Sequence, residues 1–179
     1  MRKIFAVLAA VLLALVVSAP SASAASPHFK KNGSPTCTIS TSGATSSTTC
    51  QAVLAGLGNA DVDITVTVGG FAVYQCQNGG GNTAPGQNKV LVGPVTAPTH
   101  IDASEIKNGN LSFVTNPAVL TASDTVSGAA AGCPNPNWTG VSPTLTVTSI
   151  VMDISQGGLL FHCTASNPNG LSGTVALSC

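Results

Sequence analysis

The stretch from Asp61 to Tyr74, DVDITVTVGGFAVY, is the longest run of alternating apolar and polar residues in the chain. Val62 and every second residue as far as Val68 would occupy one face of a strand, and acids and threonines would occupy the other. This period of two predicts a half-buried β-strand. Gly69 and Gly70 then interrupt the pattern, which indicates a bulge or a sharp bend before the strand resumes.

Further strand candidates lie on both sides of this stretch. They are CTIS near Cys37, TTCQAVLAG near Cys50, NKVLVGPVTA near Val90, HIDASEI near Ile101, NLSFVT near Phe113, VSPTLTVTSIVMDIS, GLLFHCTAS and LSGTVALS. Asn-Gly, Gly-Gly and Asn-Pro turn signals separate them, and no convincing helical period is present. The alanine-rich residues 117–132 could hold one helical turn, but we expect them to be a loop. About eight or nine strands at this spacing predict an all-β, antiparallel, immunoglobulin-like sandwich, with one domain over residues 25–179.

Residues 1–24 have the organisation of a secretory signal peptide. Arg2 and Lys3 precede an apolar run from Ile4 to Val17, and an Ala-x-Ala motif ends at Ala24. The apolar run is shorter than the roughly 20 residues that a membrane-spanning helix requires. We therefore expect cleavage near Ala24, a secreted extracellular protein, and no membrane segment after cleavage.

The chain beyond the signal has few charges. Its basic residues are Lys30, Lys31, Lys89 and Lys107, and its acidic residues are Asp61, Asp63, Asp102, Glu105, Asp124 and Asp153. Phosphate contacts supply most nucleic-acid affinity, and this sequence has no basic cluster to make them. We expect no nucleic-acid partner.

All six cysteines follow the signal, and an even number in an exported chain predicts disulfides. The cysteines are widely spaced and lack the close pairs of a zinc site. Several pairings are possible. The strand candidates favour one, in which two pairs staple hairpins and the third ties the middle of the chain: Cys37 with Cys50, Cys163 with Cys179, and Cys76 with Cys133.

Six short segments make the chain similar to a group of small exported actinobacterial proteins whose mature sequences begin Ser-Pro-His-Phe. The segments are SPHFKKN (26–32), AGLGN (55–59), YQCQNGGGN (74–82), NKVLVGPV (88–95), KNGNLSF (107–113) and CPNPN (133–137). The resemblance implies secretion and a β-rich fold, with the counterparts of Cys76 and Cys133 as a shared disulfide. It implies no activity.

Size, composition, low charge and an AGL turn before a strand that leads to a cysteine also resemble the neocarzinostatin apoprotein family. Its members are exported immunoglobulin-like sandwiches that carry an enediyne chromophore. This similarity implies a second hypothesis, a carrier of a small apolar ligand held between the sheets.

Residues that could support catalysis are few. His28, His100 and His162 are the available imidazoles, and no Gly-x-Ser-x-Gly motif frames a serine. Asp61 and Asp63 would project from one strand face at a spacing compatible with the two carboxyl groups of a glycoside hydrolase. However, they lie at the start of a strand, where we expect both side chains to be solvated. We therefore expect no enzyme and no catalytic residue. A cryptic extracellular hydrolase is the third hypothesis.

Two patterns resemble fragments of metal sites. Asn59, Asp61 and Asp63 form N-x-D-x-D, which lacks the glycine turn and distal glutamate of a calcium loop. His28 lies near the expected mature N-terminus, where a copper motif would use the second backbone amide, but Pro27 has no amide hydrogen. We expect no metal and no cofactor.

The segment YQCQNGGGN places Gly79, Gly80 and Gly81 directly after Asn78. A phosphate-binding loop would need these glycines to open a helix, whereas here strand candidates flank them, so the pattern predicts a turn. A Cys76–Cys133 disulfide would bring this turn close to the CPNPNW loop that ends at Trp138. We expect Asn78, the three glycines and Trp138 to form an uncharged contact site for an extracellular partner, in a protein that binds rather than catalyses.

Overall fold

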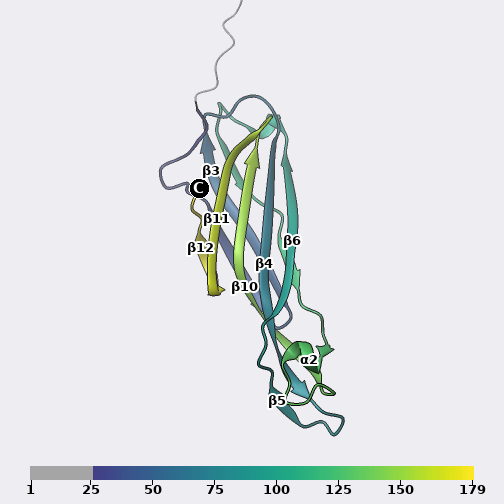
Figure 1. The fold of residues 1–179 in the computed structure, drawn as a ribbon. Coiled ribbons are helices and arrows are strands. Elements are labelled where there is room, and N and C mark those ends of the chain that lie inside the picture. The colour runs from purple at the N-terminus through teal and green to yellow at the C-terminus, as the bar shows by residue number, and fades with distance from the viewer. Residues whose placement is uncertain (1–25) are drawn as a thin grey trace, which may run out of the picture.

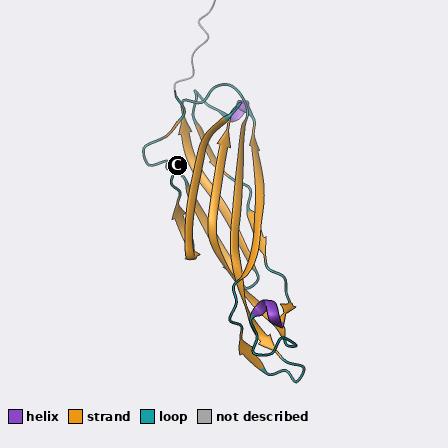
Figure 2. Ribbon diagram, viewed as in Figure 1, coloured by secondary structure: helices purple, strands orange, loops and turns teal. Residues whose placement is uncertain are grey.

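The computed structural model describes residues 26–179, in which two antiparallel sheets pack against each other as a sandwich (Figures 1 and 2). Sheet A contains β1 (His28–Phe29), β2 (Thr36–Ser42), β3 (Thr45–Ala55), β7 (Leu111–Val114), β8 (Ala118–Thr121) and β12 (Gly173–Ala176). Sheet B contains β4 (Val62–Gln77), β5 (Thr83–Pro85), β6 (Val90–Ile101), β9 (Val126–Ser127), β10 (Thr139–Ser155) and β11 (Leu159–Leu171). The helices are η1 (Ala103–Glu105) and α2 (Gly128–Ala131).

This architecture confirms the predicted disulfide-stapled, all-β antiparallel sandwich. The predicted signal peptide lies outside the described residues. Neither helix within residues 26–179 has the length and apolarity that crossing a membrane would require.

Strand β4 lies at the centre of sheet B, between β10 and β6. Its alternation is realised as predicted, because Val62, Ile64, Val66 and Val68 are fully buried. The registers of β4 with both neighbours shift at the Gly69–Gly70 pair, which confirms the expected irregularity.

The interior is one core to which both sheets contribute. Leu54 of β3 packs in the same cluster as Ile64 of β4 and Ile150 of β10, and all three side chains are fully buried. One polar side chain in this core has an unpaired hydroxyl group. The Thr48 hydroxyl, on β3, is buried and has no hydrogen-bond partner in the structure, which costs folding free energy.

We therefore expect Thr48→Val to raise the free energy of unfolding by about 1 kcal/mol, because valine keeps the shape and removes an unpaired hydroxyl. Thr115→Val is the matched control, since the Thr115 hydroxyl is buried but accepts the Cys50 N–H at 2.9 Å. That control should lose about 1 kcal/mol. Urea denaturation of both variants measures the change in the free energy of unfolding. Changes of the same sign in the two variants would contradict the prediction.

The six cysteines form the three predicted pairs. Cys37 and Cys50 lie directly opposite each other on β2 and β3. The backbone N–H and C=O of Cys50 bond to Thr115 instead of to Cys37. The cysteines therefore form a non-hydrogen-bonded pair, the kind whose side chains approach most closely, and their Cα atoms are 4.0 Å apart.

The prediction that Cys163 and Cys179 staple a hairpin is right only next to the disulfide. Cys163 belongs to β11 of sheet B, but the chain leaves that sheet after Leu171 and joins sheet A as β12. After β12, Ser178 forms an isolated antiparallel bridge with Thr164 of β11, so the disulfide joins the C-terminal segment to β11 beside this bridge and links the two sheets.

Two segment predictions are also corrected. HIDASEI is not a strand throughout, because β6 ends at Ile101 and the Asp61 carboxylate accepts the Ala103 N–H at 2.8 Å, where η1 begins. Residues 117–132 are not a loop. They form β8, which pairs with the first half of β3, then β9 and α2. The short strands β1 and β5 were not predicted.

Candidate functional site

The predicted contact residues lie at one end of the molecule. There β4 and β10 continue beyond the strands of sheet A, and β5 and α2 pack beside them (Figure 1). We call the exposed part of this end the tip surface and define it as Asn78–Asn82 together with Pro134–Trp138.

The glycine loop is a closed, hydrogen-bonded turn. The Asn78 side-chain oxygen accepts the N–H groups of Gly80 at 3.0 Å and Asn82 at 2.9 Å. The Asn78 N–H in turn donates to the Asn82 carbonyl at 3.0 Å, and Gly81 has a φ of 81°, which glycine adopts without strain. The predicted turn is therefore present, and backbone N–H groups of the turn itself are hydrogen-bonded to the Asn78 side-chain oxygen.

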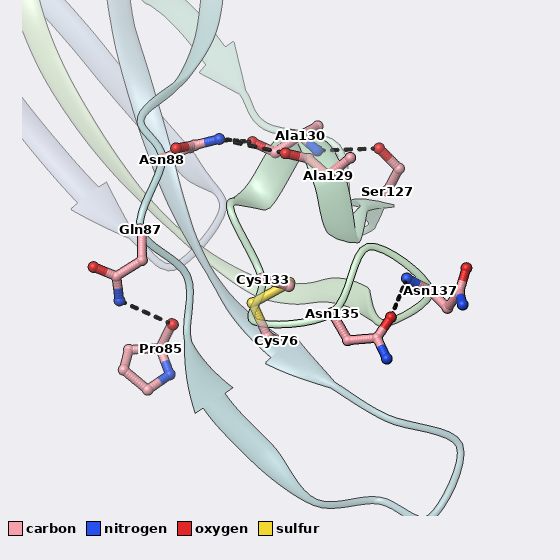
Figure 3. Close-up of a disulfide and its surroundings, with 10 residues drawn as sticks. All are labelled: Cys76, Pro85, Gln87, Asn88, Ser127, Ala129, Ala130, Cys133, Asn135 and Asn137. Carbon is pink, nitrogen blue, oxygen red and sulfur yellow. Dashed lines mark hydrogen bonds between the residues drawn. A yellow bond between two sulfur atoms is a disulfide. The ribbon is translucent and has the colours of Figure 1, made fainter.

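Helix α2 places the second cysteine of this end. Ser127 caps its N-terminus by accepting the Ala130 N–H at 3.2 Å, and Gly132 ends it in the left-handed region. The Cys133 N–H then donates to the Gly128 carbonyl at 2.8 Å, and the Gly132 N–H donates to Ala129 at 3.2 Å, which is the pattern of a Schellman cap. This cap orients Cys133 toward Cys76 of β4, and the two are bonded (Figure 3).

The segment after β5 clamps α2 from the other side. The Asn88 side chain donates to the carbonyls of Ala129 at 3.3 Å and Ala130 at 3.1 Å, as Figure 3 shows. The Asn88 N–H also donates to the Ala131 carbonyl at 3.1 Å. Asn88 thus satisfies carbonyls that a four-residue helix leaves free.

The CPNPNW loop is ordered in the same way. The Asn135 side-chain oxygen accepts the Asn137 N–H at 2.9 Å (Figure 3), and the Asn135 carbonyl accepts the Trp138 N–H at 3.0 Å. Thr139, the first residue of β10, pairs with Gln77, the last residue of β4, so Trp138 and Asn78 lie just beyond the paired ends of these two strands. The structure therefore brings the predicted contact residues together.

Trp138 has two roles in this arrangement. It is half-buried and packs against the core cluster, so it covers the end of the sandwich, as well as contributing to the tip surface. Gly128 lies against it so closely that a Cβ there would be 2.3 Å from the Trp138 carbonyl oxygen. The rest of the tip surface is exposed, except for half-buried Asn78, and it carries no charged residue.

A second group of polar side chains lies at the opposite end of sheet B. Asp63 and His100 are opposite each other on β4 and β6, and His100 Nδ1 lies 2.7 Å from Asp63 Oδ1. His100 Nε2 lies 3.8 Å from Asp61 Oδ2 and 3.7 Å from Asp102 Oδ1. The hydrogen bond to Asp63, and the negative charges around the ring, raise the pKa of His100 above its usual value.

His162 and Asp153 form a similar pair on β11 and β10, with 2.6 Å between Nδ1 and Oδ1. Clustered histidines and aspartates are what a hydrolase would need. In residues 26–179, however, no hydroxyl is hydrogen-bonded to Nε2 of either histidine. His28 Nδ1 donates to the Ser26 carbonyl at 2.9 Å, and His28 lies on β1 of sheet A, whereas both pairs lie on sheet B.

The hollows on the surface of residues 26–179 include two that lie beside strands of the sandwich. One of about 400 Å³ lies beside β3 and β7 and is lined by residues of sheet A and of the 32–36 segment, among them Gln51, Phe113 and Val114. The other, of about 240 Å³, lies beside β10 and the end of β11. Each hollow is lined by exposed residues together with buried ones, Ala52 and Phe113 in the first and Leu145 and Val147 in the second.

Sequence reasoning predicted the tip residues but not the His100 group. Asp61 and Asp63 are far in the sequence from His100 and Asp102, and only the pairing of β4 with β6 brings them together. No protein-family model matches this chain, and a search of curated proteins finds no match either.

Proposed function

We propose that the protein is an extracellular, non-enzymatic binding module that contacts its partner through the tip surface. The observation that supports this proposal is the order of the tip. Two loops far apart in the sequence are joined by the Cys76–Cys133 disulfide, and each is held by its own asparagine. A surface that is ordered before binding loses little conformational entropy when it binds.

The chemistry of the tip surface favours an uncharged polar partner. Asn82, Asn135 and Asn137 expose amide groups, Gly79–Gly81 leave backbone accessible, and Trp138 supplies an aromatic side chain. Amides hydrogen-bond to hydroxyl and amide groups, and an aromatic ring stacks on the apolar face of a sugar. A neutral saccharide of an extracellular surface is the partner class that these groups fit best.

Trp138→Ala is expected to weaken binding at least about tenfold, because truncating an aromatic hot-spot residue at an interface typically costs about 2 kcal/mol or more. The measurement is binding of the disulfide-bonded protein to an array of neutral and charged glycans. Leu91→Ala is the matched control, since Leu91 is 86% exposed and lies on β6, outside the tip surface. Equal binding by the wild type and a folded Trp138→Ala variant would refute the proposal.

A further inference from the structure

We propose that Asp61, His100 and Asp102 form a binding site for a divalent first-row transition metal, with Zn²⁺ as the reference ion. The site lies at the end of the sandwich opposite the tip surface. Figure 2 shows the two helices at these two ends, and η1, which follows Asp102, marks the metal end. The proposal is independent of the proposed function.

The three donor atoms already converge. One atom from each of Asp61, His100 and Asp102 lies within 4.8 Å of the other two. The imidazole nitrogen Nε2 is 3.8 Å from the Asp61 oxygen and 3.7 Å from the Asp102 oxygen. In a tetrahedral zinc site with bonds of about 2.1 Å, neighbouring donors are about 3.4 Å apart. These two separations are within half an ångström of that value, and the third, between the two carboxylate oxygens, is at most 4.8 Å. The donors therefore need to move closer together to bind a metal, and all three belong to exposed side chains.

Asp63 supplies the outer contact that metal-binding histidines use. A ligating histidine almost always donates its other ring N–H to a carboxylate or a carbonyl. Asp63 Oδ1 lies 2.7 Å from His100 Nδ1, so the Nδ1–H tautomer is favoured and the Nε2 lone pair faces the two carboxylates. Asp61 is fixed as well, because its Oδ1 accepts the Ala103 N–H at 2.8 Å and its Oδ2 is the oxygen that faces the ring.

The electrostatics of the site favour a cation. Three carboxylates share one imidazole, so the group is negatively charged even when His100 is protonated. In the described part of the chain, no lysine nitrogen lies within 4.0 Å of any carboxylate oxygen. Three carboxylates that share one imidazole repel one another, and a divalent ion relieves that repulsion.

The donor set favours a transition metal over calcium. Calcium takes six to eight oxygen ligands, whereas an imidazole nitrogen with carboxylates suits zinc, copper, iron or nickel. The calcium fragment N-x-D-x-D is not assembled as a loop, because Asp63 is bonded to His100 and Asp61 to Ala103. The side chain of His100 is 56% exposed, so water or a partner's group has access to the positions that these three ligands leave open.

The test is isothermal titration of the metal-free, disulfide-bonded protein, with any affinity tag removed, against ZnCl₂ and separately against CaCl₂ at pH 7.5. We expect one equivalent of Zn²⁺ to bind and to raise the melting temperature, and Ca²⁺ to bind more weakly. His100→Gln and Asp102→Asn should abolish Zn²⁺ binding. Asp63→Asn should weaken it about 10- to 100-fold, the usual effect of losing an outer-sphere partner.

His162→Gln is the matched control, because His162 has the same contact from Nδ1 to a carboxylate but belongs to no group of three metal-binding side chains in residues 26–179. It should bind Zn²⁺ as the wild type does. Co²⁺ absorption gives a second readout, since a bound Co²⁺ reports its ligands directly. Zn²⁺ binding that survives in a folded His100→Gln variant would overturn the proposal, and so would tighter binding of Ca²⁺ than of Zn²⁺.

Discussion

Removal of the Cys76–Cys133 disulfide in a Cys76→Ala/Cys133→Ala variant is expected to lower the free energy of unfolding by about 4 kcal/mol. The two cysteines are 57 residues apart in the sequence, the longest separation of the three disulfides. In the chain-entropy model, a cross-link that closes a longer loop restricts the unfolded chain more strongly. Guanidinium denaturation, followed by circular dichroism under non-reducing conditions, measures the loss.

The Cys37→Ala/Cys50→Ala variant provides the comparison. Its loop spans 13 residues, so the same argument gives a loss of about 3 kcal/mol. Cys37, Cys50 and Cys76 are fully buried and Cys133 is half-buried, so lost packing would act against the expected order and not produce it. A larger loss from the shorter loop would show that loop closure does not set the order of the two effects.

Gly70→Ala is the second large effect that we expect, a loss of about 3 kcal/mol of stability. A Cβ at Gly70 would lie 2.1 Å from the Thr146 carbonyl oxygen and 3.1 Å from the Val147 Cα. These are backbone atoms of β10 and cannot rotate away, so the alanine must push β4 and β10 apart.

Gly69→Ala is the adjacent control. A Cβ there would meet only the Ser149 hydroxyl, at 3.0 Å, and a serine side chain can change rotamer. We expect this variant to lose less than about 1 kcal/mol. Thermal unfolding of both variants checks the prediction, which fails if the two losses are equal.

The fold of sheet B could be predicted from local pattern because burial alternates along the first part of β4, from Val62 to Val68. Val62, Ile64, Val66 and Val68 are fully buried, so the sequence period and the structure agree. The disulfide pairing was predictable for a related reason, since cysteines on successive strand candidates come face to face when those strands pair. Cys163 and Cys179 show the limit of that argument, because the chain changes sheets between them.

Helix α2 could not be predicted from sequence period. Four residues make one helical turn, too short for a hydrophobic period to appear or for a helix to be stable alone. Its stability comes from Ser127, the left-handed Gly132 and the Asn88 side chain. Asn88 is 41 and 42 residues away from the carbonyls that it binds, so only the folded chain shows this contact.

The His100 group was missed for a similar reason. Asp63 and His100 are 37 residues apart, and an error of one residue in the pairing of β4 with β6 would place them on opposite faces. Sequence pattern gives the faces of each strand but not this register. The tip was predictable because a disulfide links its two loops, whereas the group at the other end has no covalent link.

Strand β4 connects the two ends of the molecule through one continuous stretch of backbone. It runs without a break from Val62, beside the His100 group, to Gln77, beside the glycine loop, a span of about 50 Å for an extended chain of this length. The Cys76–Cys133 bond couples the far end of this strand to the loop that leads into β10. Tension between a partner held at the tip and an attachment at the opposite end would therefore pass along covalent backbone, with the long β4–β10 ladder loaded in shear.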